Sequence, residues 1–420
     1  MTTNPLTSES DCRNLLDRAF NAAIAAAMPR EAVLRNLPDK PSGRCFVVGA
    51  GKASAAMAAA VDEAWQDVDL TGVVSTRYGH GVDAGRIRVI EAGHPVPDAN
   101  STEAAQAMLD LLQATTPDDL VLALISGGGS ATLALPIEPL SLEEKQGITR
   151  SLLSSGASIA EMNIVRKHLS LVKGGKLAEA ATPARLHTLI ISDVPGDDPG
   201  TVASGPTVPQ TGTAIDALGV IDRYHIQISS ALRHHLETTA SPPCTARGTH
   251  RVIASSAMAL RAAADVASSA GATPMILGDS IEGESREVAR VMASIARSVG
   301  NHATPALLIS GGETTVTIGT EGAGRGGRNT EFALSLALAL DGAPGVWGLA
   351  ADSDGIDGTE DAAGAIVGPE TLIRACESGI SPEACLDGHD SYALFDATGD
   401  LIRTGPTLTN VNDIRLILVL

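Results

Sequence analysis

The segment VVGAGKAS at residues 47–54 decides the fold of the first half of the chain. Two valines lead into glycines, and an alanine-rich stretch of helical character follows. A strand that turns directly into a helix aims backbone N–H groups and the positive end of the helix dipole at an anion. A tight turn without a ligand would need the same glycines, so both interpretations stay open. Gly49 and Gly51 are candidate cofactor-binding residues, and Lys52 is a candidate catalytic residue.

Two named motifs match this segment only in part. A Walker A loop would need glycine at position 46 and Ser or Thr at position 53, where the chain has Phe46 and Ala53. A dinucleotide fingerprint would need a small apolar residue in place of Ser54 and an acidic residue after the next strand, where residues 75–77 read STR. Neither motif assigns the ligand.

Runs of apolar residues of strand length recur along the whole chain and alternate with helical patterns. Such alternation predicts an α/β fold, with a Rossmann-like parallel-sheet N-terminal domain and a second, smaller α/β domain. We expect strands at residues 45–48, 72–75, 88–90, 120–125, 186–191, 251–254, 274–277, 306–309, 345–349, 391–395 and 415–419.

A chain of 420 residues exceeds the usual size of one core, so two domains are expected. Residues 238–249 are rich in turn formers and predict a linker. The expected domains are residues 1–245 and 246–420. An amphipathic helix capped by Ser8 or Ser10 is expected within the first thirty residues.

Composition excludes several classes of partner. A net charge of -19 and an aromatic content of 2% disfavour nucleic acid as a partner, because phosphate backbones would be repelled and bases would find few stacking surfaces. The sequence contains no secretion signal and no apolar run long enough to cross a membrane. Five cysteines form no CxxC pair, which favours a reducing cytoplasm. A homodimer is compatible with the sequence, which does not decide the oligomeric state.

The run SGGGS at residues 126–130 follows an apolar strand, and three adjacent glycines cost backbone entropy that packing alone does not require. A ligand loop is the favoured interpretation. A second Ser-Gly-Gly follows the strand at residues 306–309. The candidate cofactor-binding residues of the two loops are Ser126, Gly127, Gly128, Gly129, Ser130, Gly311, Gly312 and Glu313.

Charged side chains near further strand ends and glycines supply the remaining candidates. Asp193 follows a strand, where a carboxylate could bind Mg²⁺ or accept a hydroxyl proton. Asp352 begins DSDGID, a metal site or a set of Asx turns with equal weight. Lys173 precedes two glycines, as a cofactor ligand or at a helix cap. Arg328 lies in the glycine-rich loop GRGGRN and could clamp an anion.

Together these segments resemble the class II glycerate 2-kinase family over nearly the whole chain. The resemblance is carried in order by VVGAGKAS, GHPVPD, SGGGSA, NIVRKHLSLVKGGKLA, SDVPGDDPGTVASGPT, SGGETTV, GRGGRNTEFAL, DSDGIDGTEDAAGA and TGPTLTNVND. It implies a Rossmann-like N-terminal domain, a smaller MOFRL domain and an active site between them.

The same resemblance implies a reaction in which ATP and Mg²⁺ phosphorylate the C2 hydroxyl of D-glycerate to give 2-phosphoglycerate. Lys52, Asp193 and Arg328 fall on the family's functional positions, and ATP is expected along the glycine-rich loops. Some members are labelled hydroxypyruvate reductases, which leaves an NAD(P)H-dependent reductase as the alternative.

Overall fold

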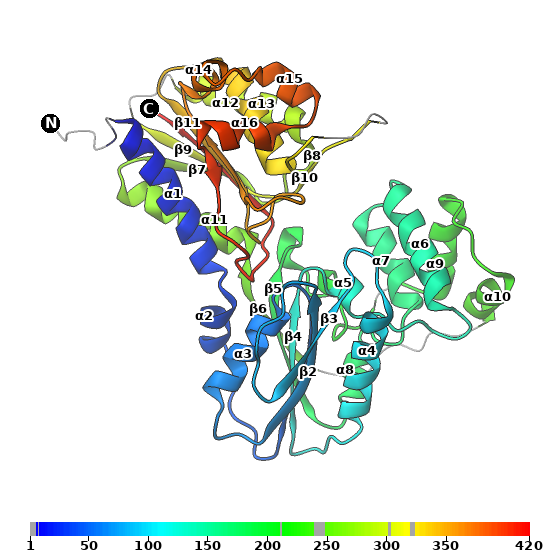
Figure 1. Cartoon of the computed structure of the whole chain (residues 1–420). Helices are drawn as coiled ribbons and strands as arrows, with labels where there is room; N and C mark the ends of the chain where they lie inside the picture. Colours follow the sequence, from blue (N-terminus) through cyan, green and yellow to red (C-terminus); the bar gives the residue numbers. More distant parts are fainter. Residues whose placement is uncertain (1–5, 7, 211, 239–247, 301–303, 320–323) are drawn as a thin grey trace. The chain divides into compact units, whose positions relative to one another are not determined.

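The computed structural model describes residues 6, 8–210, 212–238, 248–300, 304–319 and 324–420. These residues divide into two compact units (Figure 1). The parallel-sheet unit comprises residues 29–253, and the mixed-sheet unit comprises residues 1–28 together with residues 254–420. Most of the expected linker, residues 239–247, lies outside the described residues.

The structure divides the chain differently from the expected domains, because the N-terminal helix joins the C-terminal half. Helix α1 (Glu9–Ala26) begins with a capping box in which Ser8 accepts from Asp11 N, as one of the two expected caps. Its buried face, which includes Leu16 and Phe20, packs along α11 (Ser256–Ser269) (Figure 1). An amphipathic helix must bury its apolar face against some layer, and sequence position does not determine which one.

The parallel-sheet unit is built on a six-stranded sheet in the order β3-β2-β1-β4-β5-β6. Its central strands are buried along their whole length, as expected for parallel strands covered on both faces. The chain order reverses between β1 and β4, which is where open α/β sheets bind ligands at the carboxyl ends of their strands. The strands are β1 (Cys45–Ala50), β2 (Leu70–Arg77), β3 (Ile87–Ala92), β4 (Leu120–Ser126), β5 (Arg185–Ser192) and β6 (Gly248–Ser255).

Helices of the parallel-sheet unit cover the sheet and also form a separate helical cluster. Four of them, α6, α7, α9 and α10, pack around their own apolar core, which includes Ile148, Leu152 and Val165 (Figure 1). The unit's α-helices are α2 (Pro29–Leu34), α3 (Ser54–Ala64), α4 (Ala99–Leu112), α5 (Gly129–Thr132), α6 (Leu142–Ser154), α7 (Ile159–His168), α8 (Lys176–Ala180), α9 (Ala214–Arg223) and α10 (Ser230–Thr238). Short 3-10 turns are η1 (Pro195–Asp197) and η2 (Val202–Ser204).

The mixed-sheet unit has a six-stranded sheet in the order β13-β12-β11-β14-β9-β7. Only the β7–β9 pair of this sheet is parallel, and the other pairs are antiparallel. The strands are β7 (Thr273–Gly278), β9 (Ala306–Ser310), β11 (Val346–Asp352), β12 (Gly364–Val367), β13 (Leu401–Ile402) and β14 (Asp413–Val419), and a small ribbon pairs β8 (Gly283–Glu284) with β10 (Thr314–Thr315). The remaining α-helices are α12 (Ser285–Val299), α13 (Arg328–Leu340), α14 (Thr371–Glu377), α15 (Pro382–Asp387) and α16 (Ser391–Thr398).

The α/β class and the Rossmann-like first sheet are confirmed, but one expected strand is wrong. Residues 391–395 form the start of α16, which buries Tyr392, Leu394 and Phe395. A short apolar run fits a buried helix as well as a strand. No helix in the described ranges combines the length and apolarity that crossing a bilayer requires.

Candidate active site

The loops that follow β1 and β4 pack directly against each other at the point where the strand order reverses. Lys52 N donates to Gly127 O over 2.8 Å, and Ala53 N donates to Ser126 Oγ over 3.0 Å. Gly51 has a φ of +124°, and a Cβ at this position would lie 2.3 Å from Ser126 O. Glycine is therefore required here for the two loops to approach each other.

Lys52 lies at the start of α3 beside the glycine-rich loop after β4. Gly128 has a φ of +79°, and a Cβ there would lie 3.2 Å both from Lys52 Cγ and from His94 Cδ2. Lys52, His94 and the loop are thus neighbours. The predicted residues Gly49, Gly51, Lys52 and those of the 126–130 loop are brought together at one edge of the sheet.

Asp193 extends from the same edge. It follows β5, in which Ile191 is paired with Ser126 at the end of β4. The side chain is half-buried. The next carboxylate pair behaves as turn chemistry predicts, since Asp198 accepts from Gly200 N over 3.0 Å and from Thr201 Oγ1 over 2.7 Å. Asp193 therefore lies next to the 126–130 loop, where it could act on a ligand.

Lys173 is placed inside the protein. Its side chain is among the largest fully buried ones, and Nζ donates to Leu133 O over 2.8 Å. Burial lowers the pKa of Lys173 well below its ordinary value, and the positive charges of Lys145 and Arg166 lower it further. Gly175 is the N-cap of α8 with a φ of +88°, so the glycines after Lys173 do mark a helix end. A direct contact of Lys173 with a cofactor stays a prediction.

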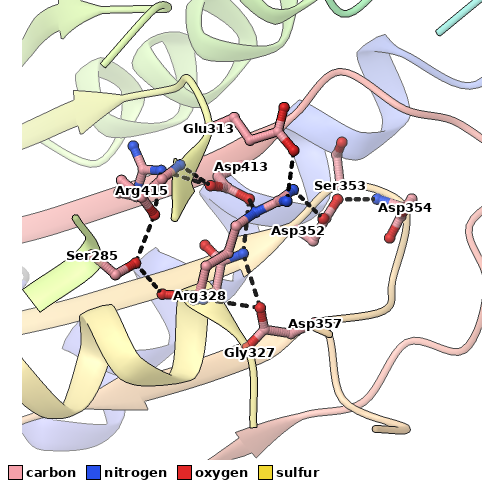
Figure 2. A network of polar contacts seen from close by, with 12 residues as sticks. Ser285, Glu313, Gly327, Arg328, Asp352, Ser353, Asp354, Asp357, Asp413 and Arg415 are labelled. Carbon is pink, nitrogen blue, oxygen red and sulfur yellow. Dashed lines mark hydrogen bonds and ion pairs between the residues drawn. The ribbon is translucent and has the colours of Figure 1, made fainter. Parts of the chain in front are cut away.

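A second group of predicted residues lies in the mixed-sheet unit, centred on Arg328 at the start of α13 (Figure 2). Its guanidinium donates to three carboxylates: to Asp413 over 2.8 Å, to Glu313 over 2.7 Å and to Asp352 over 2.7 Å. Burial disfavours the charge, but Asp413, Asp352 and Glu313 together raise the pKa of Arg328 above its ordinary range. Arg328 is therefore a permanent cation that is already neutralised by its neighbours.

Asp413 joins this network to a second arginine. Its carboxylate is fully buried and also accepts from Arg415 Nη2 over 2.6 Å (Figure 2). Arg415 Nη1 donates to Gly311 O over 3.2 Å, and Asp413 N donates to Gly312 O over 3.1 Å. The predicted glycines after β9 thus accept from the network through their carbonyl groups.

The acidic loop after β11 supports α13. Asp357 accepts from Asn329 N over 2.9 Å and from Thr330 N over 2.8 Å, which satisfies the first backbone donors of the helix. Complete burial raises the pKa of Asp357, although the bonds from Asn329 and Thr330 oppose this shift. Asp352 accepts from Asp354 N over 2.9 Å, which is an Asx turn.

The candidate residues could supply only one or two protein ligands to Mg²⁺. Among the described residues, no group of three or more His, Cys, Asp or Glu side chains is arranged to hold a metal ion. Mg²⁺ in nucleotide sites is usually held by one or two carboxylates plus substrate phosphates, which a single Asp193 or Asp352 would satisfy. The assignment of either residue to Mg²⁺ stays a prediction.

The sequence predictions missed three residues that the structure makes prominent: Asp413, Arg166 and Asn163. Asp413 is the first residue of the apolar strand β14, where an acidic residue indicates a strand boundary. Arg166 and Asn163 lie three residues apart on α7, where polar residues read as a solvated face. The sequence held little signal for Asp413, because it stands at the amino end of its strand, whereas sites of open α/β sheets lie at the carboxyl ends.

Comparison with known proteins decides the family. The family model described as "Domain of unknown function (DUF4147)" matches residues 15–237, and that of the MOFRL family matches residues 306–413. A D-glycerate 2-kinase of Thermotoga maritima is 41% identical, with 94% of this chain and 96% of the relative covered. The chain belongs to the glycerate 2-kinase family with DUF4147 and MOFRL domains.

Other members of the glycerate 2-kinase family extend this finding. A crystal structure of glycerate kinase from Thermotoga maritima matches with a TM-score of 0.88 and 39% identity, covering 98% of this chain and all of the other. A relative from Agrobacterium vitis named "Putative hydroxypyruvate reductase" is 56% identical, with 98% of this chain and 95% of the relative covered. Both names expected from the resemblance therefore occur in the family.

Proposed function

We propose that this protein is an ATP-dependent glycerate 2-kinase, which transfers the γ-phosphoryl group of ATP to the C2 hydroxyl of D-glycerate. The observation that carries the proposal is the packing of the Lys52 loop against the 126–130 loop at the switch point of the sheet, with Asp193 following the strand that pairs with Ser126, in a chain that aligns with glycerate kinases over nearly its full length. ADP and 2-phosphoglycerate are the products, and the reaction needs no redox cofactor.

Phosphoryl transfer depends on positioning and on neutralising charge at the transferred group. Lys52 supplies a cation at the start of α3, where the helix dipole also favours an anion. Asp193 orients the attacking C2 hydroxyl and accepts its proton as the bond from the γ-phosphorus to ADP breaks. Asp193 or Asp352 would hold Mg²⁺, which would supply positive charge to neutralise the phosphates of ATP.

We assign Arg328 to phosphate binding on the family resemblance. Its three carboxylate partners differ in exposure, since the side chain of Glu313 is 56% exposed whereas those of Asp352 and Asp413 are buried. A phosphate oxygen that displaced the Glu313 carboxylate would bind the edge of the guanidinium that Glu313 now occupies. The buried pairs with Asp352 and Asp413 would keep the guanidinium in place. Glu313 is accordingly the partner that ATP would replace.

Two observations support the reductase alternative: the name of the Agrobacterium vitis relative and the Rossmann strand order. Ser54, at the third glycine position of the dinucleotide fingerprint, argues against this alternative. Ser54 Oγ is buried there and donates to Gly51 O over 2.8 Å and to Ser75 O over 2.6 Å. The end of β2 also lacks the acidic residue that would bind a ribose. We therefore favour the kinase.

Assays of one preparation separate the two functions. Purified protein is incubated with D-glycerate, ATP and Mg²⁺, and in parallel with hydroxypyruvate and NADH or NADPH. We expect ADP formation in the first assay only, with NMR showing phosphate on C2. Nucleotide oxidation without ADP formation would overturn the proposal, and 3-phosphoglycerate would overturn the position of transfer.

We also assign the protein to the cytoplasm, because Cys12, Cys45, Cys376 and Cys385 are free thiols.

A further inference from the structure

Among the described residues, a group of cationic side chains in the parallel-sheet unit has no carboxylate within ion-pair distance. This cationic cluster consists of Lys145 on α6, Arg166 on α7, Lys173 and Lys176. Lys145 Nζ donates to Leu169 O over 3.2 Å, and Lys176 Nζ donates to Lys167 O over 3.1 Å. The ammonium groups are thus satisfied by neutral carbonyls, and in the described part of the chain none of the four cations forms an ion pair.

The positive charges of the cluster act on one another. Burial lowers the pKa of Lys145 to about 7, and the charges of Arg166 and Lys176 contribute to this shift. Glu179 favours the charge of Lys176, but from beyond ion-pair distance. Buried like charges are costly unless an anion compensates them. The protein retains a local excess of positive charge despite its net charge of -19.

Arg166 is the member of the cluster that could meet a ligand. Its side chain is half-buried, and burial lowers its pKa. Across the described residues its guanidinium makes neither a hydrogen bond nor an ion pair, although arginine presents five donors in a planar fork suited to carboxylate and phosphate. The N–H donors of the Arg166 guanidinium are therefore available to a ligand.

A second, independent group points to the same place. Asn163 lies three residues before Arg166 on α7, so the two side chains share a helix face. Asn163 is only 5% exposed, and its Oδ1 accepts from Ser204 Oγ over 2.8 Å. Its Nδ2 is buried without a hydrogen-bond partner in the described structure. Buried amide donors are rarely left unsatisfied, so this N–H group indicates a missing acceptor.

Asn163 is linked through Ser204 to the glycine-rich loop of the candidate active site. Ser204, which holds Asn163, lies with its Oγ 2.6 Å from the Oγ of Ser130 at the end of that loop. Ser204 and Ala203 hold positive φ angles of 61° and 52°, which are uncommon for these residues and often found at functional sites. The amide of Asn163 is therefore fixed from its oxygen side, and its nitrogen is left for a ligand.

We propose that Asn163 Nδ2 and the Arg166 guanidinium form an oxyanion-binding subsite, backed by the cationic cluster, for a carboxylate or phosphoryl group of the substrates. This assignment rests on the proposed function for the identity of those substrates. Both candidate groups present paired, negatively charged oxygens, which match the arginine fork and an amide N–H. The subsite would place that group next to Ser130 and the backbone of the 126–130 loop.

Equilibrium binding tests this subsite without requiring turnover. Calorimetry measures the affinities of D-glycerate, ATP and inorganic phosphate for the wild type, Arg166→Gln, Asn163→Asp and Arg150→Gln. Arg150 is an exposed cation on α6 and serves as the charge-matched control. Asn163→Asp keeps the acceptor for Ser204 but replaces the N–H donor with a second oxygen. Thermal unfolding confirms that each variant is folded.

We expect Arg166→Gln and Asn163→Asp each to weaken D-glycerate or ATP at least about 10-fold, as loss of a charge-assisted hydrogen bond predicts, whereas Arg150→Gln changes neither more than about 3-fold. Weakening of D-glycerate identifies a carboxylate subsite, and weakening of ATP and inorganic phosphate identifies a phosphate subsite. Unchanged affinities, or equal weakening in the control, would overturn the subsite. If phosphate binding depends on Arg166 but glycerate is not phosphorylated, the subsite stands and the proposed function fails.

Discussion

The two Ser-Gly-Gly loops, residues 126–130 after β4 and residues 310–313 after β9, share a sequence pattern but lie in opposite electrostatic surroundings. The first lies beside Lys52 and near a cationic cluster that forms no ion pair with any described residue. The second accepts from a network in which Asp352, Asp413 and Glu313 surround Arg328. A strand followed by glycines leaves room for a ligand, but side chains from distant segments determine the charge around each loop.

We expect the largest effect from a substitution of Arg328, the cation beside the second loop. Arg328→Ala leaves the buried carboxylate of Asp352 without its cation and removes one of the two arginines at Asp413. Removing one partner of a buried ion pair typically costs about 3–5 kcal/mol. We expect a loss of about 3 kcal/mol in the free energy of unfolding, measured by urea denaturation. Arg328→Lys, which keeps the charge but loses the forked geometry, should lie between wild type and Arg328→Ala.

A control for Arg328 is available in the same unit. Arg290→Ala removes an exposed pair with Glu287 on α12, and we expect a change within about 0.5 kcal/mol. Equal stabilities of Arg328→Ala and Arg290→Ala would mean that the carboxylates find other partners. Activity of Arg328→Ala must be measured where the variant is folded, because instability alone would lower the rate.

The first loop is tested by Lys52→Met. We expect kcat to fall about 10²- to 10³-fold, because a cation at the transferring phosphoryl group acts mainly on the transition state. Lys40→Met is the control, since Lys40 is exposed and forms its ion pair with the exposed Asp67. Steady-state kinetics with ATP and D-glycerate measures the effect. A rate for Lys52→Met close to that of the control would remove Lys52 from the proposed mechanism.

Much of the scaffold could be predicted, because the fully buried strands β1 and β4 leave a continuous apolar record in the sequence. The Ser8 cap and the switch-point glycines could also be predicted, because helix caps and glycine turns depend on residues that are close in sequence. The pairing of α1 with α11 and the helix at residues 391–395 could not be, since they depend on which surface a segment finds. Asp413 was missed because its partners lie far away along the chain, and Arg166 because its role rests on its having no partner among the described residues.

Asp193 tests whether the carboxyl edge beside the first loop is catalytic. We expect Asp193→Asn to reduce kcat about 10²-fold, the usual lower range for loss of a general base, while thermal unfolding stays near wild type. Asp197→Asn is the matched control, because Asp197 has a φ of 55° and asparagine tolerates that conformation. Similar activity of the two variants would assign Asp193 to the turn and not to the chemistry.

The smallest effect separates the buried cations of the two regions by their dependence on pH. Arg415 is buried beside the carboxylate of Asp413, whereas buried Lys145 donates to the neutral carbonyl of Leu169. Burial lowers the pKa of Lys145 to about 7, from about 10.4 in an unfolded chain. Between these values the unfolded state binds a proton that the folded state does not, so the stability of the wild type should rise with pH.

Lys145→Met removes this proton and nearly preserves the volume of the side chain. Its stability should therefore match or exceed that of the wild type at pH 7, where the buried charge is costly, and the wild type should gain on it above pH 7 by up to about 1.4 kcal/mol per pH unit. Urea denaturation at pH 7, 8 and 9 measures the difference, and Lys40→Met should show no such trend. Because Lys173 and the other titrating groups remain in both proteins, their contributions largely cancel. Parallel stability curves for wild type and Lys145→Met would mean that Lys145 stays charged in the folded protein, and the cationic cluster would then contain an anion or water that compensates it.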